Sequence, residues 1–416
     1  MVRKSNQYKI KKRIKLDAGI YKNYLLDYFE KIGWLNTSSL ISSKSNSPIE
    51  IPKIFSIKDN PNETLSILKK IFEYRYLNVK NIYIDFKNCS SATICASSVL
   101  VILLLNLIEE QGIVINTNLS NKKENDILFL HNGFVKYLNM EPIEEEAKTY
   151  IDTLNDEISH IKILKLLVGG KSSISFKRIA SDLQNNNLIE IIQSDGGHHV
   201  VNFFNQCLKE NNHSLKDVAI SQIRSFFGEV LDNTYNHLEN DISQFFSLGI
   251  YDTILKKGNL LMFNFGRTIY EGLKDPENKE ILEVLNELTE VHKNNFNPEF
   301  NEETLWTLAS LQKTISRCYN EEEKRGCGLP SLITSFKDLS KATEFPELTI
   351  ISGRTLIKFN SSIEWTFENG VIAFNKENIL TLPPSSKNVI ALNEYFPGTL
   401  ILFDFNIDEK WLIKEI

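Results

Sequence analysis

A long apolar helix between two short strands constrains the fold of this chain more than any other feature. Residues 81–86 have the pattern of a short buried strand, residues 93–110 form an apolar helix, and residues 113–117 have a second strand pattern. Strands joined through a helix by such short connections are expected to lie parallel, with a right-handed crossover. We therefore expect an α/β fold in this part of the chain.

The apolar helix is expected to pack against a sheet rather than to cross a membrane. Its unbroken apolar run covers only residues 99–105, and Ser97, Ser98 and Asn106 interrupt the longer stretch. A transmembrane helix needs about 20 consecutive apolar residues. The N-terminus also has no signal-peptide core. We therefore predict no membrane partner and a cytoplasmic location.

Cysteine usage and charge restrict the partners of the chain. Its five cysteines form no CxxC pair, and an odd number argues against a disulfide framework or a zinc site. A net charge of -6 over 416 residues argues against nucleic acid as the main partner. Basic residues between Arg3 and Lys15 leave a nucleic-acid arm open as the alternative to a solvated strand or tail.

Residues 220–238 are predicted to form a helix with an apolar stripe and a polar stripe. The apolar stripe comprises Ile223, Phe227, Val230, Leu231, Thr234 and Leu238. The polar stripe comprises Glu229, Asn233, Asn236 and His237. A carboxylate there could accept a proton from an attacking water or hydroxyl, and an Asn oxygen one turn later could bind Mg²⁺. An ordinary amphipathic helix with a polar flank is the alternative interpretation.

A glycine turn at residues 325–329 precedes a predicted helix at residues 329–336. Gly326 and Gly328 would let backbone N–H groups approach phosphate oxygens closely, and the helix N-terminus adds partial positive charge. Arg325 stands beside this turn. Cys327 between the glycines is interpreted as a small packing residue, with a reactive thiol as the alternative. A purely structural turn that starts the helix would have the same pattern.

Both motifs resemble boxes of the GHKL ATPase superfamily, whose domains have the Bergerat fold, and the resemblance covers about residues 200–410. The first family box is E-x-x-x-N, often with His four residues later, and Glu229, Asn233 and His237 match it. The resemblance implies that Glu229 is the general base, that Asn233 binds Mg²⁺ and that His237 lines the site.

The second family box is D-x-G-x-G-I after a strand, and it corresponds to residues 264–269 after a predicted strand at residues 258–263. Gly266 and Ile269 match, whereas Thr268 replaces the second glycine. Asn264 replaces the aspartate that accepts a hydrogen bond from the adenine amino group in the family. An Asn carbonyl can still accept such a bond, but the side chain is uncharged and can flip.

The third family box, G-x-G-L, is matched by Gly326, Gly328 and Leu329, and the resemblance includes Arg325 and Cys327 in the nucleotide site. The closing strand of the family often starts with Gly-Thr. Residues 396–405 resemble it, which adds Thr399 to the implied nucleotide-binding residues.

The remaining segments of the GHKL-like region are assigned by pattern. Residues 270–324 are expected to form a mobile lid over the nucleotide, with a helix at residues 306–315. Residues 348–353 and 355–359 are predicted to form a hairpin. Residues 194–199, which contain Gly196 and Gly197, are predicted to interrupt the preceding helices.

Residues 51–140 resemble STAS-like domains, the fold of anti-sigma-factor antagonists. In that family a phosphorylatable serine begins the helix after the first strand, in a D-S-S-G-type turn. The corresponding residues 92–98 lack the Asp and Gly of that turn. Helix capping and packing therefore explain Thr93, Ser97 and Ser98 more simply than phosphorylation does.

These patterns define four segments: an N-terminal segment and linker at residues 1–50, a STAS-like α/β domain at 51–150, a helical connector at 151–199 and a GHKL ATPase domain at 200–416, with helices on one face of a mixed sheet.

The resemblance implies an ATP- and Mg²⁺-binding protein that hydrolyses ATP slowly as a conformational switch in bacterial regulation or defence. Two alternatives stay open: a serine/threonine protein kinase acting on a STAS-like partner, and a non-catalytic nucleotide-binding adaptor. A protein partner or a homodimer is expected.

Overall fold

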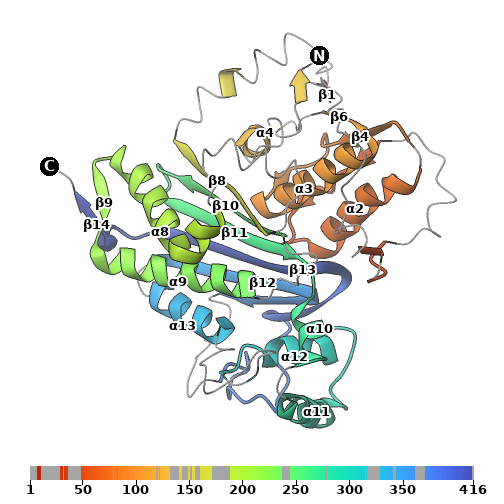
Figure 1. Ribbon diagram of the computed structural model, residues 1–416, viewed down its shortest axis with the longest axis vertical. Coiled ribbons are helices and arrows are strands. Elements are labelled where there is room, and N and C mark those ends of the chain that lie inside the picture. Colours follow the sequence, from red (N-terminus) through yellow and green to blue (C-terminus); the bar gives the residue numbers. More distant parts are fainter. Residues whose placement is uncertain are drawn as a thin grey trace. The chain divides into compact units, whose positions relative to one another are not determined.

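The computed structural model describes residues 7–10, 29–30, 32–35, 48–77, 79–118, 120, 122–131, 140–142, 149, 152–154, 160–170, 188–236, 244–276, 279–313, 315, 328–340, 343–360 and 371–414. Some helix and strand residues, among them Glu229 and Asn233, are described by their backbone alone. The described chain divides into two compact units, one ending at Ile163 and one starting at Leu164. Both units combine helices with strands (Figure 1), so the α/β class is confirmed at this level.

A five-stranded sheet organises the first unit. Its strand order is β2 (Ile49–Glu50), β4 (Asn81–Asp85), β6 (Val114–Asn118), β1 (Gln7–Ile10) and β7 (Met140–Pro142). Strand β4 lies parallel to β6, and the helix between them is α3 (Ile94–Gln111), so the predicted strand, helix and parallel strand are confirmed. Strand β1 joins this sheet antiparallel to β6 and β7, which brings part of the N-terminal segment into the first unit.

Helix α3 is buried along most of its length, and its ends are set by local signals. Thr93 is the N-cap, and its hydroxyl accepts a hydrogen bond from the Ala96 N–H at 3.5 Å. Gly112 ends the helix with φ +62, a conformation that favours glycine. Within the described part of the chain, no helix is long and apolar enough to cross a membrane.

Shorter elements complete the first unit. Helix α2 (Pro61–Glu73) contacts α3 and continues into η2 (Tyr74–Leu77). Strands β3 (Ile54–Phe55) and β5 (Ser91–Ala92) form a parallel pair. Helix α4 (Lys123–His131) follows β6.

The second unit is built on another five-stranded sheet, with the order β12 (Thr343–Phe359), β13 (Val389–Ile407), β11 (Lys257–Phe265), β10 (Gln244–Asp252) and β8 (Ile161–Gly170). The pairs β12–β13, β13–β11 and β11–β10 are antiparallel. Strand β8 comes from the segment predicted as a helical connector, so the second unit begins earlier than residue 200.

The hairpin predicted at residues 348–359 is wrong, because these residues belong to the single strand β12. The pairing of β12 with β13 shifts register on both sides of Gly353, where φ is +59. A glycine with positive φ fits a chain reversal as well as an irregular place in a continuing strand. The pattern of residues does not distinguish the two. Pairing with β13 shows a continuing strand with a bulge in the pairing, whose extra residues lie on β13.

Three helices cover one face of this sheet (Figure 1): α8 (Leu188–Lys209), α9 (Asp217–Asn236) and α13 (Gly328–Ser340). Alternate strand residues such as Met262, Ile401 and Phe403 point to the helices and share one hydrophobic core with them. Phe226 of α9 lies at the centre of this contact, with its ring centroid 4.8 Å from that of Phe403.

The interruption predicted at residues 194–199 is also wrong, since α8 runs without a break through Gly196 and Gly197. A Cβ atom on Gly197 would lie only 2.3 Å from the backbone oxygen of Arg224 on α9. Glycine is therefore present because the two helices approach closely there, and tertiary packing outweighs its low helix propensity.

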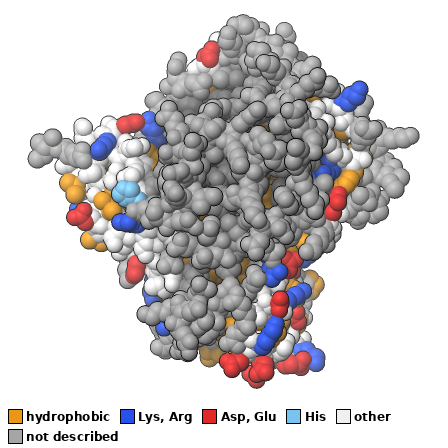
Figure 2. All heavy atoms as spheres, viewed as in Figure 1, with side chains coloured by type: hydrophobic (Ala, Val, Ile, Leu, Met, Phe, Trp, Pro, Cys, Tyr) orange, Lys and Arg blue, Asp and Glu red, His pale blue; other side chains and the backbone are white. Residues whose placement is uncertain are grey.

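The part of the predicted lid that the structure describes is a packed helical layer made of α10 (Ile269–Leu273), α11 (Glu280–His292) and α12 (Glu302–Ala309). Leu273, Leu285, Leu305 and Trp306 contribute to a separate hydrophobic cluster between these helices. Helix α12 contacts β12, and it starts four residues before the predicted helix at 306–315 because Asn301 caps it. Acidic and basic side chains gather on the surface around α11, at the lower end of Figure 2.

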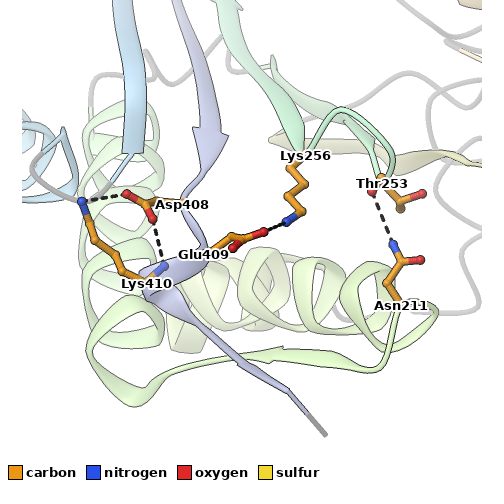
Figure 3. Close-up of polar contacts among 6 residues, drawn as sticks. All are labelled: Asn211, Thr253, Lys256, Asp408, Glu409 and Lys410. Atoms are coloured by element: carbon orange, nitrogen blue, oxygen red, sulfur yellow. Dashed lines mark hydrogen bonds and ion pairs between the residues drawn. The ribbon is translucent and has the colours of Figure 1, made fainter.

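Polar contacts connect the β10–β11 turn to the last described residues and to Asn211 (Figure 3). Lys256 of this turn pairs with Glu409 at 2.8 Å, and the turn residue Thr253 accepts a hydrogen bond from Asn211 at 3.4 Å. Glu409 belongs to η3 (Glu409–Trp411), which leads into β14 (Leu412–Lys414), and β14 pairs with β9 (His213–Leu215). These contacts lie at one end of β11, and the candidate site lies at the other.

Candidate functional site

The second box lies where β11 ends and α10 begins. Asn264 is the last but one residue of β11 and is 7% exposed. Gly266 has φ +156, a conformation that L side chains rarely adopt, and its N–H donates to the Pro397 carbonyl at 3.2 Å. Glycine is therefore needed at the point where the chain exits the sheet. Because glycine has no side chain, the space beside the Asn264 amide stays open.

Asn264 is more than nine-tenths buried, and neither atom of its amide is among the buried side-chain nitrogen and oxygen atoms of the described residues that lack a hydrogen-bond partner. A Cβ atom on Gly266 would lie 3.4 Å from the Asn264 Nδ2. The amide therefore lies at the strand end, directly beside a glycine.

Thr268 has a structural role that explains why it can replace a glycine. Its backbone is extended, with φ −73 and ψ 165, so no glycine is needed at this position. Its hydroxyl accepts from the Glu271 N–H at 3.2 Å, and the Glu271 carboxylate accepts from the Thr268 N–H at 2.9 Å. This capping box fixes the start of α10.

A serine that sequence reasoning missed connects β12 to β13 and to the start of α10, beside Asn264. Ser352 of β12 pairs with Thr399 of β13, and Thr399 pairs in turn with Asn264 of β11. The Ser352 Oγ accepts from the Ile269 N–H at 2.9 Å, donates to the Gly398 carbonyl at 3.2 Å and lies 2.9 Å from the Thr399 Oγ1. The only signal in the sequence was a serine directly after the apolar pair Ile350 and Ile351, and its full burial is seen only in the structure.

The first box lies on α9, as predicted. Ile223, Phe227 and Val230 of the predicted apolar stripe are buried in the core, and α9 contacts both β11 and α13. Glu229 and Asn233 belong to α9, but their side chains lie outside the described part, as do those of Leu231 and Thr234. His237 and Leu238 lie outside the described residues altogether.

The third box leads into α13, which begins at Gly328. Arg325, Gly326 and Cys327 lie outside the described residues. Leu329 packs against the same hydrophobic core as Ile269 of the second box and Val230 of the first box. The helix is also joined to α9 by the hydroxyls of Ser225 and Ser335, 3.3 Å apart. Residues from all three boxes therefore contact one hydrophobic core.

A second polar set joins the helical layer to the strands near the candidate site. The Tyr395 hydroxyl of β13 donates to the Glu271 Oε1 at 2.8 Å. Glu303 of α12 accepts from the Arg354 N–H at 2.6 Å, next to the bulge in the pairing of β12 with β13. Burial raises the pKa of the Glu303 carboxyl above its ordinary value, against the opposing effect of the Arg354 N–H. These contacts hold α10 and α12 against β12 and β13.

The residues that the structure describes contain few side chains suited to binding a metal ion together. No group of three or more His, Cys, Asp or Glu side chains is placed there to hold a metal ion. A Mg²⁺ ion that arrives with a nucleotide keeps several waters and needs only one or two protein oxygens besides phosphate. The predicted single ligand, Asn233, is compatible with that second kind of site.

The serines at the start of α3 have structural roles. Ser97 is fully buried and donates to the Thr93 carbonyl at 2.8 Å, and Ser98 is 4% exposed. Thr93 caps α3. A kinase could not reach the two serines without opening the helix, which agrees with the capping and packing interpretation.

Comparisons with known proteins identify no relative of this chain: no family model, no curated protein and no solved structure matches it.

Proposed function

We propose that the second unit is a Bergerat-type ATPase domain that binds ATP with Mg²⁺ and hydrolyses it slowly as a conformational switch in bacterial regulation or defence. The observation that carries the proposal is the position of Asn264 at the end of β11, directly before the turn at Gly266, whose φ is +156. It lies at the strand end where the resemblance puts the adenine-binding residue.

The shared core of the three boxes supports the same proposal. Helix α9 carries Glu229 and Asn233, α13 starts in the third box, and both pack on the core that includes Ile269. In this proposal Asn264 contacts the base, the turn at residues 325–328 holds phosphate, and Glu229 takes a proton from the attacking water. Bound Mg²⁺ would neutralise phosphate charge, with Asn233 as its protein ligand.

Phosphate release by the purified full-length protein with Mg²⁺ and ATP tests the proposal. Glu229→Ala is expected to lower kcat by about 10²–10⁴-fold, the usual contribution of a general base. Glu287→Ala is the matched control, because Glu287 is an exposed residue on α11 away from the boxes. Unchanged turnover in Glu229→Ala would refute the assigned base.

Two other outcomes separate the alternatives. Transfer of radiolabel from the γ-phosphate to protein would favour the kinase, whose STAS-like partner the first unit resembles. Absence of ATP binding at millimolar nucleotide, measured by calorimetry, would refute nucleotide binding and leave only a role as an adaptor.

For the metal, Asn233→Ala is expected to weaken Mg²⁺-dependent nucleotide binding more than metal-free nucleotide binding. Equal effects on both would refute the role of Asn233 as a Mg²⁺ ligand.

A further inference from the structure

Helix α11 carries an apolar strip on its outer surface. Val284 and Val291 are 44% and 51% exposed, and Leu288 between them is half-buried. These three residues are spaced i, i+4 and i+7, so their side chains follow one face of the helix over about 10 Å. Exposed apolar residues that occur singly are ordinary, whereas a continuous apolar strip marks a candidate surface for contact with another molecule.

A second segment adds two apolar side chains at the end of α11. The His292 Nε2 lies 2.7 Å from the Leu380 carbonyl oxygen, 88 residues away in the sequence, so this loop lies against the last turn of the helix. Ile379 and Leu382 of the loop are 46% and 40% exposed. The Asn375 amide donates to both of their carbonyl oxygens, at 2.9 and 3.1 Å, which fixes the loop. Four of the nine exposed large hydrophobic side chains in the described part of the chain therefore lie on α11 or at its end.

Acidic side chains border one side of the strip. Helix α11 contains no Lys or Arg and four exposed glutamates, which are Glu280, Glu283, Glu287 and Glu290. The lysines next to its ends already pair with acids, Lys279 with Asp275 at 2.9 Å and Lys293 with Glu290 at 3.3 Å. Acidic side chains are visible at the lower end of Figure 2, where α11 lies in Figure 1. The apolar strip therefore has a negatively charged rim.

The charge of this rim decides which molecule fits the strip. Nucleic acids and anionic membrane surfaces carry the same sign of charge and are repelled by the glutamates. A second copy of the chain that used the same face would bring the glutamates of two α11 helices together. A helix with Lys or Arg beside its apolar face matches the strip and the rim, because packed helices lie about 8–10 Å apart and their flanking charges then attract.

We propose that α11 and the loop at residues 379–382 form a docking surface for an amphipathic helix of a protein partner, with Lys or Arg along one side of its apolar face. Val284, Leu288 and Val291 contact the apolar face of that helix, and Glu283 and Glu287 lie opposite its cations. The strip is on the outer helix of the helical layer and on none of the three boxes, so the docking surface does not depend on nucleotide binding.

Fluorescence anisotropy of a labelled model helix tests the proposal on the full-length protein. The probe is a synthetic amphipathic peptide of leucine and lysine, and the comparison peptide has glutamate in place of every lysine. The lysine peptide is expected to bind at least about tenfold more tightly, and added salt should weaken its binding because exposed charges are screened. Equal affinities of the two peptides would overturn the assigned chemistry of the partner.

Paired substitutions locate the bound peptide. Val284→Ser together with Val291→Ser should raise the Kd of the lysine peptide by about tenfold or more, because apolar contact is lost while Ser and Val have similar helix propensities. Glu283→Gln together with Glu287→Gln should raise the Kd by about threefold or more at low salt, and less at high salt.

Val218→Ser is the matched control, since Val218 is a 66% exposed valine in the first turn of α9. It should leave the Kd unchanged, and circular dichroism checks that each variant folds. An unchanged Kd in the double valine variant would overturn α11 as the docking surface. A wild-type dimer that sedimentation equilibrium detects and the double valine variant loses would assign the strip to a second copy of the chain instead.

Discussion

At the scale of single residues, two departures from the GHKL pattern have different physical explanations. Thr268 stands where the family has glycine, and it caps α10 from an extended backbone that any residue adopts. Asn264 stands where the family has aspartate, and it is a buried residue near the end of β11. The first substitution affects only how α10 begins, whereas the second bears on what the site can bind.

Ser352 is predicted to be the more important hydroxyl of the pair that joins β12 and β13. In Ser352→Ala the Ile269 N–H loses its acceptor, so the free energy of unfolding should fall by about 1–3 kcal/mol. Thr399→Val should have a smaller effect, about 0.5–1.5 kcal/mol, because the Thr399 hydroxyl contacts only Ser352 among the described residues. Urea unfolding of both variants measures the difference, and equal losses would contradict the assigned role of Ser352.

At the scale of elements, contacts between elements decide what an ambiguous pattern becomes. The glycines of residues 196–197 lie inside α8 because α9 approaches so closely that a Cβ atom on Gly197 has no room. The strand β12 continues through Gly353 because residues on both sides of this glycine pair with β13. In both places the local pattern suggested a break in the element, and packing against a neighbour removed it.

Two helical glycines of the second unit are predicted to respond in opposite directions to alanine. Gly197→Ala should lower the free energy of unfolding by about 1–3 kcal/mol, since its Cβ would meet the rigid backbone of α9. Gly228→Ala on α9 should leave the free energy of unfolding unchanged or raise it by up to about 1 kcal/mol. No atom lies within 4 Å of the Cβ position at residue 228, and alanine favours helix more than glycine does. Thermal and urea unfolding compare the two, and a tolerated Gly197→Ala would disprove the close contact.

At the scale of the whole molecule, the candidate site belongs to one unit. Each of the three boxes lies on elements of the second unit, and α9, α13 and Ile269 share a single core there. The first unit has its own sheet and its own buried helix α3. The proposed function therefore assigns nucleotide binding to the second unit and leaves the first unit for a protein partner.

Hydrogen exchange of the full-length protein is predicted to locate the nucleotide. With Mg²⁺ and ADP, amide exchange should slow at residues 264–269 and along the part of α9 that carries Glu229 and Asn233. Exchange in β4 and β6 of the first unit serves as the internal reference and should change little. Protection confined to the first unit would contradict the assignment of the site.

Much of the secondary structure could be predicted because it depends on local patterns. Short apolar runs predicted β4 and β11, a longer apolar run predicted α3, and apolar spacing predicted the buried face of α9. The polar partners of the candidate site could not be predicted in this way. Ser352 lies more than 80 residues from Ile269 in the sequence, and only the pairing of β12 with β13 brings the two together.

The sequence by itself determined which segments become helix or strand and which residue types are present at the three boxes, because propensity, periodicity and capping act within a few residues of each other. Only the tertiary structure decided that Gly197 is a close contact between α8 and α9, that the strand continues through Gly353, and that the Ser352 hydroxyl meets the Ile269 N–H. Burial and hydrogen-bond satisfaction depend on atoms from distant segments, which pattern and spacing along the chain do not specify.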